Sequence, residues 1–234
     1  MRIYSTDEIE QQSPEWFALK DLKLTSSEAT AIGNNGKGLD SLCRKLVREH
    51  YSSAERNQWT NRDLDRGNEL EPVARELYEL ETGRKIEKVG FIELDNRTGC
   101  STDGLIGEDG VAEIKAPDDA TYFKVLMDME VDSDYSWQVQ MELVVTGRNY
   151  VDLIEYNPNF EKSMVIFRIY PDLVKQEALR KGIEMGKVLI EKYLALYQDR
   201  LKESGPKIIG KELKEEIVIV YEGSKKPRAI NLKK

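Results

Sequence analysis

Three side chains near the middle of the chain have the types and spacing needed for hydrolysis with a metal ion. They lie in the segment STDGLIGEDGVAEIKAP, residues 101–117. Because side chains alternate between faces along a strand, Glu113 and Lys115 are expected on one face. Asp103 precedes a tight turn at Gly104, and a hairpin would return Glu113 close beside it. Two carboxylates and one ammonium are therefore predicted to converge.

This combination suits the hydrolysis of a phosphodiester bond. Carboxylate oxygens with a few waters are the ligands that Mg²⁺ prefers. Such an ion lowers the pKa of a bound water and neutralises charge on a phosphate, while a neighbouring lysine can orient the water. The chain has one histidine, His50, and its two cysteines, Cys43 and Cys100, form no C-x-x-C pair. A zinc site rich in histidine or cysteine is therefore excluded, and any metal is expected to be held by oxygen.

The E-x-K spacing alone has another explanation. Glu113 and Lys115 could form an exposed ion pair on an ordinary strand. Glu212 and Lys214 repeat the spacing near the end of the chain without an aspartate–glycine turn ahead of them, and we interpret that copy as having no catalytic role. The turn that follows Asp103 favours the catalytic interpretation of the first copy.

Hydrophobic periodicity predicts the elements that must position these side chains. Helices are predicted over residues 13–19, 39–51, 62–81, 118–129 and 133–145, from Thr25 onward, and from Pro171 until Gly205-Pro206. Strands are predicted over residues 85–94, 99–106, 111–116, 150–156 and 164–170, the first three as an antiparallel meander, and residues 33–38 as a flexible loop. Helices on both sides of about five strands indicate an α/β domain of three layers.

The helix predicted over residues 62–81 carries polar residues beside its apolar stripe. The stripe is expected to consist of Leu70, Val73, Ala74, Leu77 and Leu80. Glu71, Arg75 and Tyr78 lie on one edge of it. A carboxylate at this edge could reach the sheet, although a solvated surface glutamate would give the same pattern.

The helix predicted over residues 133–145 has a similar border. Its core face is expected to present Trp137, Met141 and Val144. Tyr135, Gln138 and Glu142 share the bordering face. Gln138 could there bond Lys115 or a metal-bound water, or simply lie at the rim of a buried helix.

Charge and length indicate one domain with a basic extension. The chain has 234 residues and a net charge of −8. Residues 205–234 contain 8 Lys and Arg against 4 Glu, a net +4, so residues 1–204 carry −12. We predict a single domain over residues 1–204 and a basic C-terminal extension over residues 205–234, with a strand-like run at 217–221. No apolar run approaches the ~20 residues that span a bilayer, so we expect no membrane partner and a location in the cytoplasm.

Several separated segments together resemble the lambda exonuclease and YqaJ-type viral recombinase family, which has the PD-(D/E)xK nuclease core. They are, in order along the chain, Trp16 with Thr25-Ser26-Ser27-Glu28, RGNELEPVARELYELETG at 66–83, STDGL, VAEIK and YSWQVQMELVVTG at 135–147. The likeness covers residues from about 13 to 200. Thr102 stands where the name of the core expects proline, a departure that leaves the ligand Asp103 in place. The resemblance implies a restriction-endonuclease-like fold.

The resemblance also implies roles at the catalytic centre. Asp103 and Glu113 would be metal carboxylates, and the backbone carbonyl of Ile114 a further ligand. Lys115 would position the nucleophilic water. Glu71 matches the family's helix glutamate at the metal, and Gln138 matches a glutamine near the active centre.

A 5′-phosphate site is implied by the same likeness. Lys20 stands where the family has an arginine, and Ser27 matches a hydroxyl, with Thr25 nearby. Lysine offers a point charge instead of a bidentate fork. Tyr135, one turn before Gln138, is a further candidate for DNA contact. The same residues could simply cap a helix.

The function implied by the resemblance is a Mg²⁺-dependent 5′-to-3′ exonuclease on double-stranded DNA ends. Mn²⁺ is expected to substitute. The enzyme would belong to a phage-type recombination system in a bacterial host and leave a 3′ single strand for a single-strand annealing protein. Family members commonly form rings, which implies a homo-oligomer such as a trimer. The alternatives are a structure-specific or restriction-like endonuclease on the same core, and a DNA-end-binding module without activity, against which the intact Asp103, Glu113 and Lys115 speak.

Overall fold

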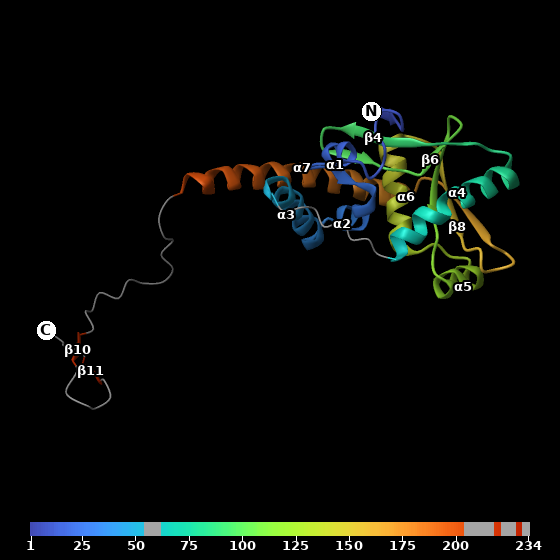
Figure 1. Ribbon diagram of the computed structural model, residues 1–234. Coiled ribbons are helices and arrows are strands. Elements are labelled where there is room, and N and C mark those ends of the chain that lie inside the picture. Colours follow the sequence, from blue (N-terminus) through green and yellow to red (C-terminus); the bar gives the residue numbers. More distant parts are fainter. Residues whose placement is uncertain (54–61, 204–217, 221–227, 231–234) are drawn as a thin grey trace. The chain divides into compact units, whose positions relative to one another are not determined.

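The central sheet has five strands in the order β3–β6–β7–β8–β9 (Figure 1). The computed structural model describes residues 1–53, 62–203, 218–220 and 228–230, and of residues 62–65, 218–220 and 228–230 the backbone alone. The strands are β3 (Ile86–Glu87), β6 (Gly104–Ile106), β7 (Gly110–Lys115), β8 (Tyr150–Tyr156) and β9 (Met164–Ile169). β7 and β8 pair in parallel, and the other neighbours pair antiparallel. The predicted α/β fold with a mixed sheet of about five strands is confirmed.

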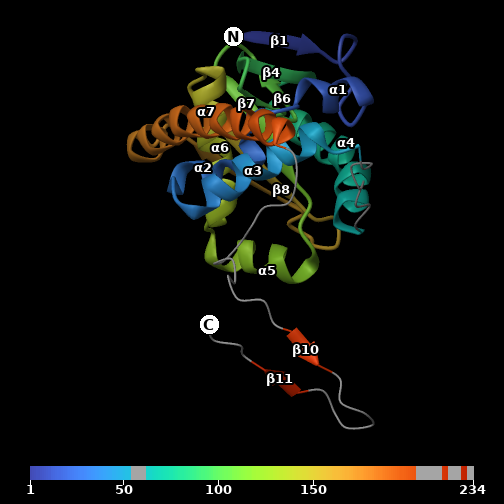
Figure 2. The ribbon, with the colours of Figure 1, turned by 90° about the vertical axis from the view of Figure 1, so that its left-hand side faces the viewer.

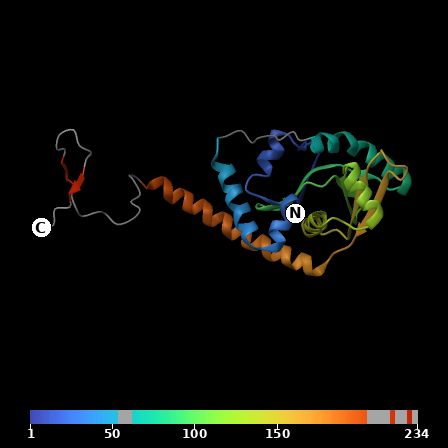
Figure 3. The ribbon, with the colours of Figure 1, turned by 90° about the horizontal axis from the view of Figure 1, so that it is seen from below.

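Helices cover both faces of this sheet (Figures 1 and 3). The helices are α1 (Pro14–Leu19), the short 3₁₀ helix η1 (Ser26–Glu28), α2 (Ala29–Asn34), α3 (Lys37–Tyr51), α4 (Arg62–Thr82), α5 (Asp119–Asp128), α6 (Ser133–Thr146) and α7 (Leu173–Lys202). Ala112 and Ile114 of β7 pack with Ala74 of α4, whereas Val111 packs with Val139 of α6. Because successive side chains of a strand point to opposite faces, each helix meets alternate residues of β7. Three layers result.

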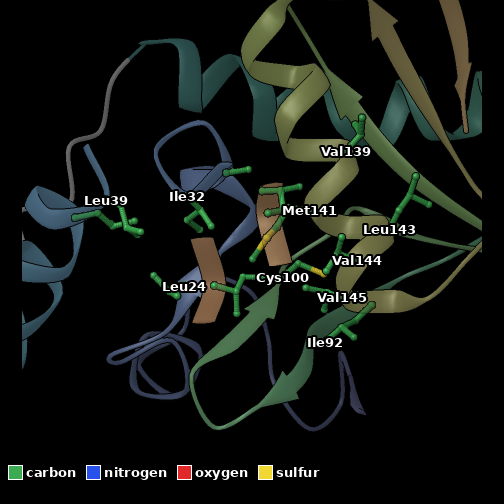
Figure 4. Packing of buried hydrophobic residues seen from close by; sticks show 14 of the residues in the cluster. Leu24, Ile32, Leu39, Ile92, Cys100, Val139, Met141, Leu143, Val144 and Val145 are labelled. Atoms are coloured by element: carbon green, nitrogen blue, oxygen red, sulfur yellow. The ribbon is translucent and has the colours of Figure 1, made fainter. Parts of the chain in front are cut away.

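Beyond α6, the first helices of the chain pack against the last one (Figure 2). Figure 4 shows the shared cluster, in which Leu24, Ile32 and Leu39 gather with Met141 and other residues of α6. Gly182 of α7 makes this close approach possible, because a Cβ there would lie 2.0 Å from the carbonyl oxygen of Ile32.

A second sheet of four strands was not predicted. Its order is β1–β4–β5–β2, with β1 at Arg2–Ser5, β4 at Val89–Asp95, β5 at Thr98–Cys100 and β2 at Leu24–Thr25. The strand predicted over residues 85–94 is interrupted at Lys88, and the strand predicted over residues 99–106 is interrupted at residues 101–103. In both cases one half joins each sheet, so the single meander was wrong.

Two side chains explain the second interruption. The hydroxyl of Thr102 donates to the carbonyl of Ala112 at 2.7 Å, and the carboxylate of Asp103 accepts from the N–H of Ile114 at 2.6 Å. At residues 102 and 103, side chains therefore bond the backbone of β7 where a continuous strand would do so with its own N–H and C=O groups. Alternation of apolar and polar residues in the sequence cannot distinguish a continuous strand from this interrupted one.

Two further predictions were wrong in detail. The predicted loop at residues 33–38 shrinks to Asn35 and Gly36, because α2 continues through Gly33. A Cβ at Gly33 would lie 2.3 Å from the ring of Trp137.

The apolar stripe predicted for the helix over residues 62–81 is partly wrong. In α4, Val73 and Leu80 are exposed, whereas Tyr78 is buried. The buried face of α4 is thus turned toward Tyr78, whose hydroxyl finds a buried partner.

The last long helix begins at Leu173, two residues after Pro171. The side chain of Asp172 accepts from the N–H groups of Val174 and Lys175 and so caps the first turn. The stop predicted at Gly205-Pro206 lies outside the described residues. No helix in the described part of the chain is long and apolar enough to cross a membrane.

The chain divides into two compact units, Met1–Gln198 and Asp199–Lys234. In the second, β10 (Val218–Val220) pairs antiparallel with β11 (Arg228–Ile230). β10 falls within the strand-like run predicted at 217–221, whose outer residues lie outside the described residues. The predicted boundary at 204–205 also lies outside them and stays a prediction.

Candidate active site

The candidate catalytic residues meet where β7 extends past the start of β6. β6 begins at Gly104, opposite Ala112, so β6 does not extend beside the last residues of β7. A cleft of 490 Å³ opens there, lined among others by Glu71, Asp103, Glu113, Ile114, Lys115 and Tyr135. Side chains from α4, β7 and α6 therefore share one cleft with the residue that precedes β6.

Asp103 is fixed by the backbone of β7. Its Oδ2 accepts from the N–H of Ile114 at 2.6 Å. In an extended strand the N–H and C=O of one residue point to the same edge, so the carbonyl of Ile114 faces the same edge as Asp103. The carbonyl of Ala112, two residues earlier, also faces this edge, because it accepts from the hydroxyl of Thr102. The carboxylate and the Ile114 carbonyl are thereby placed beside each other.

The side chains of Glu113 and Lys115 lie on the same face of β7, opposite to the side chain of Ile114, as the alternation along the strand predicted. Lys115 Nζ lies 2.8 Å from Glu113 Oε1, and Glu113 is only 4% exposed. The exposed ion pair that was the alternative explanation is therefore wrong for this copy of the spacing. Gln138 of α6 joins the pair, because its Nε2 donates to Glu113 Oε1 at 2.5 Å and its Oε1 accepts from Lys115 Nζ at 3.2 Å. Lys115 Nζ also lies 4.9 Å from the centre of the Tyr135 ring.

The charges at this site influence one another strongly. Burial raises the pKa of Asp103 well above its ordinary value, and the negative charges of Glu113 and Glu71 raise it further. Burial opposes the charged form of Lys115, but the charge and hydrogen bond of Glu113 outweigh burial and raise the pKa of this ammonium. Lys115 therefore stays protonated at neutral pH. In this arrangement it is a hydrogen-bond donor.

The residues present fit a hard divalent cation. Glu113 Oε2 is buried and has no hydrogen-bond partner in the described part of the chain. A cation would satisfy this oxygen and relieve the repulsion that raises the pKa of Asp103. No three His, Cys, Asp or Glu side chains among the described residues lie together closely enough to hold a metal by themselves. The available donors are thus two carboxylates and one carbonyl, a small set of the kind that Mg²⁺ completes with waters and phosphate oxygens.

Glu71 reaches the cleft from α4 but is already paired. Arg75 Nη2 lies 2.5 Å and Lys88 Nζ 3.3 Å from Glu71 Oε1. The predicted edge of α4 does bring Glu71 to the sheet. Its carboxylate faces two cations here.

The candidate 5′-phosphate residues are only partly brought together. Ser27 lines a hollow of 610 Å³ that also includes Tyr135 and Gln138, and so adjoins the cleft. Thr25 Oγ1 lies 3.2 Å from Ser27 Oγ, and Lys20 Nζ lies 3.8 Å from the centre of the Trp16 ring. Neither Lys20 nor Thr25 is among the residues that line the hollow. The predicted helix start is a 3₁₀ turn of three residues before the six-residue α2, so it has little helix dipole to offer.

Two buried carboxyl groups beside the site were missed as site residues. Glu142, predicted on a bordering face of α6, is 0% exposed. Glu155 of β8 is 1% exposed and lies in register with Lys115 on the neighbouring strand. The available signal was an acidic residue inside an otherwise apolar run, in ELVV and in YVDLIEY.

The comparisons with known proteins concern the family and the fold. The YqaJ-like viral recombinase domain model matches residues 15–149. The alkaline exonuclease LHK-Exo from Laribacter hongkongensis, solved alone and in complex with dAMP, is 26% identical over 81% of this chain and 100% of its own, with a TM-score of 0.72. A phage-related exonuclease from Haemophilus somnus 129PT is 14% identical over 77% of this chain and 98% of its own, with a TM-score of 0.54, and shows the fold alone. No curated protein matches the sequence. Because the family model covers more than half of its 234 residues, the chain belongs to the YqaJ-like viral recombinase family.

Proposed function

We propose that this protein is a Mg²⁺-dependent exonuclease that digests one strand of linear duplex DNA from the 5′ end. Its family and its likeness to an alkaline exonuclease indicate a nuclease, a hydrolase of DNA. One observation carries the proposed site. Asp103 and Glu113 line one cleft, Lys115 Nζ lies 2.8 Å from Glu113 Oε1, and Glu113 Oε2 has no hydrogen-bond partner among the described residues.

In this proposal Asp103, Glu113 and the carbonyl of Ile114 hold the ion. When bound, Mg²⁺ supplies charge neutralisation on the phosphate and a water of lowered pKa. Lys115 donates a hydrogen bond to the attacking water and so orients it. Gln138 holds Glu113 and Lys115 at a fixed separation, because it is bonded to both. Glu71 supplies further negative charge from α4.

For the DNA end, we propose the hollow that adjoins the cleft. Ser27 and Tyr135 line it, and Thr25 is bonded to Ser27. A terminal phosphate bound there would place the next phosphodiester over the cleft. Lys20 would add positive charge from beside Trp16. In the same proposal a ring of identical subunits, for example a trimer, keeps the enzyme on its substrate, and an annealing protein takes up the 3′ single strand that remains.

The test uses linear duplexes labelled at one end and closed plasmid circles. Release of labelled nucleotide from the 5′ end, dependent on Mg²⁺ and stopped by EDTA, is expected. Mn²⁺ should restore activity after EDTA treatment. A duplex with 5′-hydroxyl ends should be digested more slowly than a 5′-phosphorylated one, and closed circles should stay intact.

Other outcomes would point elsewhere. Cutting of closed circles would favour the endonuclease alternative. Release from the 3′ end would contradict the proposed polarity. DNA-end binding without release of nucleotide under any divalent ion would favour a module that has lost its activity.

A further inference from the structure

Glu142 lies where a carboxyl group is unfavourable for stability. It is 0% exposed and stands within the run 139–146 of α6, all of whose residues are buried. No ion pair in the described part of the chain includes it, and its Oε2 has no hydrogen-bond partner there. A buried carboxyl group with so few partners destabilises a fold relative to an apolar side chain of similar size. Stability alone therefore does not explain a glutamate at this position.

In the described part of the chain, the carboxyl group of Glu142 has one hydrogen bond, and it leads to the catalytic cleft. Its Oε1 accepts from Gln138 Nε2 at 3.1 Å, one turn earlier on α6. The same nitrogen donates to Glu113 at 2.5 Å, and the amide oxygen accepts from Lys115 at 3.2 Å. An amide nitrogen has two hydrogens, and Glu113 and Glu142 take one each.

The bond from Gln138 to Glu142 fixes the amide to its own helix, because both residues lie on α6. Without Glu142, one hydrogen of a partly buried amide would lose its acceptor, and the side chain would rotate toward water to regain one. Such a rotation would weaken the bonds from Gln138 to Glu113 and Lys115. Glu142 thus acts on the site through Gln138, without itself lining the cleft.

We propose that Glu142 is a positioning residue, which anchors the amide of Gln138 and so holds Glu113 and Lys115 in their working geometry. This proposal rests on the proposed function, because it assumes that Glu113 and Lys115 carry the reaction. Removal of a partner that orients metal ligands from behind typically lowers activity roughly 10- to 100-fold.

The test compares Glu142→Leu with Glu142→Gln in Mg²⁺-dependent nucleotide release from 5′-phosphorylated duplex. Glu142→Leu should lower kcat about 10-fold or more, with KM for DNA unchanged and the melting temperature unchanged or raised. Glu142→Gln keeps an oxygen that accepts from Gln138 and should restore most of the activity. Gln140→Leu is the matched control. Gln140 is buried on the same helix and bonds Tyr170 and Asp172 instead of the cleft, so this variant should lower the melting temperature but not kcat.

A double-mutant cycle separates positioning from a general structural role. In the Gln138→Ala background, Glu142→Leu should have no further effect on kcat, because the amide through which Glu142 acts on Glu113 and Lys115 is already absent. Additive losses, or an unchanged kcat in Glu142→Leu alone, would overturn the proposal.

Two controls remove the remaining ambiguity. If Glu142→Leu does not fold, Glu142→Met replaces it, and unfolding of both would overturn the proposal by giving Glu142 a structural role. Lys115→Ala is measured in parallel. An active Lys115→Ala would refute the proposed function itself, whereas an inactive Lys115→Ala beside a fully active Glu142→Leu would refute the positioning role alone.

Discussion

Glu155 should make the stability of the protein depend on pH. It is 1% exposed on β8, beside Lys115 on β7, and its Oε2 has no hydrogen-bond partner among the described residues. Burial raises the pKa of Glu155 from an ordinary 4.5 to about 7, although the charge of Lys115 lowers it in part. The change replaces this carboxyl group by an amide, in Glu155→Gln.

The direction in which stability changes with pH depends on whether Glu155 binds its proton more tightly in the folded or in the unfolded protein. The folded protein holds the Glu155 proton up to a pH of about 7, whereas the unfolded chain loses it near 4.5. Stability from this group is therefore complete below pH 4.5 and decreases as the pH rises through about 7. The difference in pKa corresponds to about 3 kcal/mol over this window. Glu155→Gln has no such proton and should lack this part of the dependence.

The assay is urea unfolding of both proteins between pH 4.5 and 8.5. Subtraction of the two curves removes the contribution of the other carboxyl groups. The free energy of unfolding of the wild type should fall by about 3 kcal/mol relative to Glu155→Gln as the pH rises. Glu177→Gln, at a side chain that is 61% exposed, is the control and should show no such trend. A difference between wild type and Glu155→Gln that is the same at every pH would refute the reasoning.

Two other substitutions test the packing around the site. Arg168→Ala removes both bonds, of 2.8 and 2.7 Å, to the carboxylate of the buried Asp152. Among the described residues this leaves that carboxylate only the hydroxyl of Tyr78, so the free energy of unfolding in urea should fall by about 3 kcal/mol. Unchanged stability would contradict the role of this pair. Gly104→Ala places a Cβ 2.7 Å from the carbonyl oxygen of Glu87 and must shift the residue before it, so nucleotide release should fall at least about tenfold in a protein that still folds; wild-type release would show that the cleft tolerates the shift.

The sequence predicted elements whose pattern is decided locally. β8, β9 and α6 have nearly the predicted bounds, because each is a continuous periodic run between turn residues. The predicted strand over 99–106 was wrong because the side chains of Thr102 and Asp103 replace the backbone ladder on β7. That replacement depends on a tertiary contact, so the local pattern does not contain it.

The part of the candidate site that depends on local sequence was predicted, and the part that depends on packing between distant elements was not. The spacing of Glu113 and Lys115 is local, and both line one cleft with Asp103. The tight turn predicted at Gly104 was wrong, because Gly104 begins β6 and the hairpin turn lies at residues 107–109. Glu142 and Glu155 come from later elements whose packing against β7 brings them near. The apolar runs around them were the one local sign of their burial, and that sign was outweighed because a glutamate usually indicates an exposed position.

The most direct test of the site is the rate of nucleotide release from linear duplex in Mg²⁺ by Asp103→Asn and Lys115→Ala. Asp103→Asn keeps an oxygen that can accept from Ile114, so the fold should survive, as thermal unfolding can verify. Both variants should release nucleotide at least about 100-fold more slowly than the wild type. Release at the wild-type rate by either folded variant would contradict the assignment of these residues as the catalytic centre.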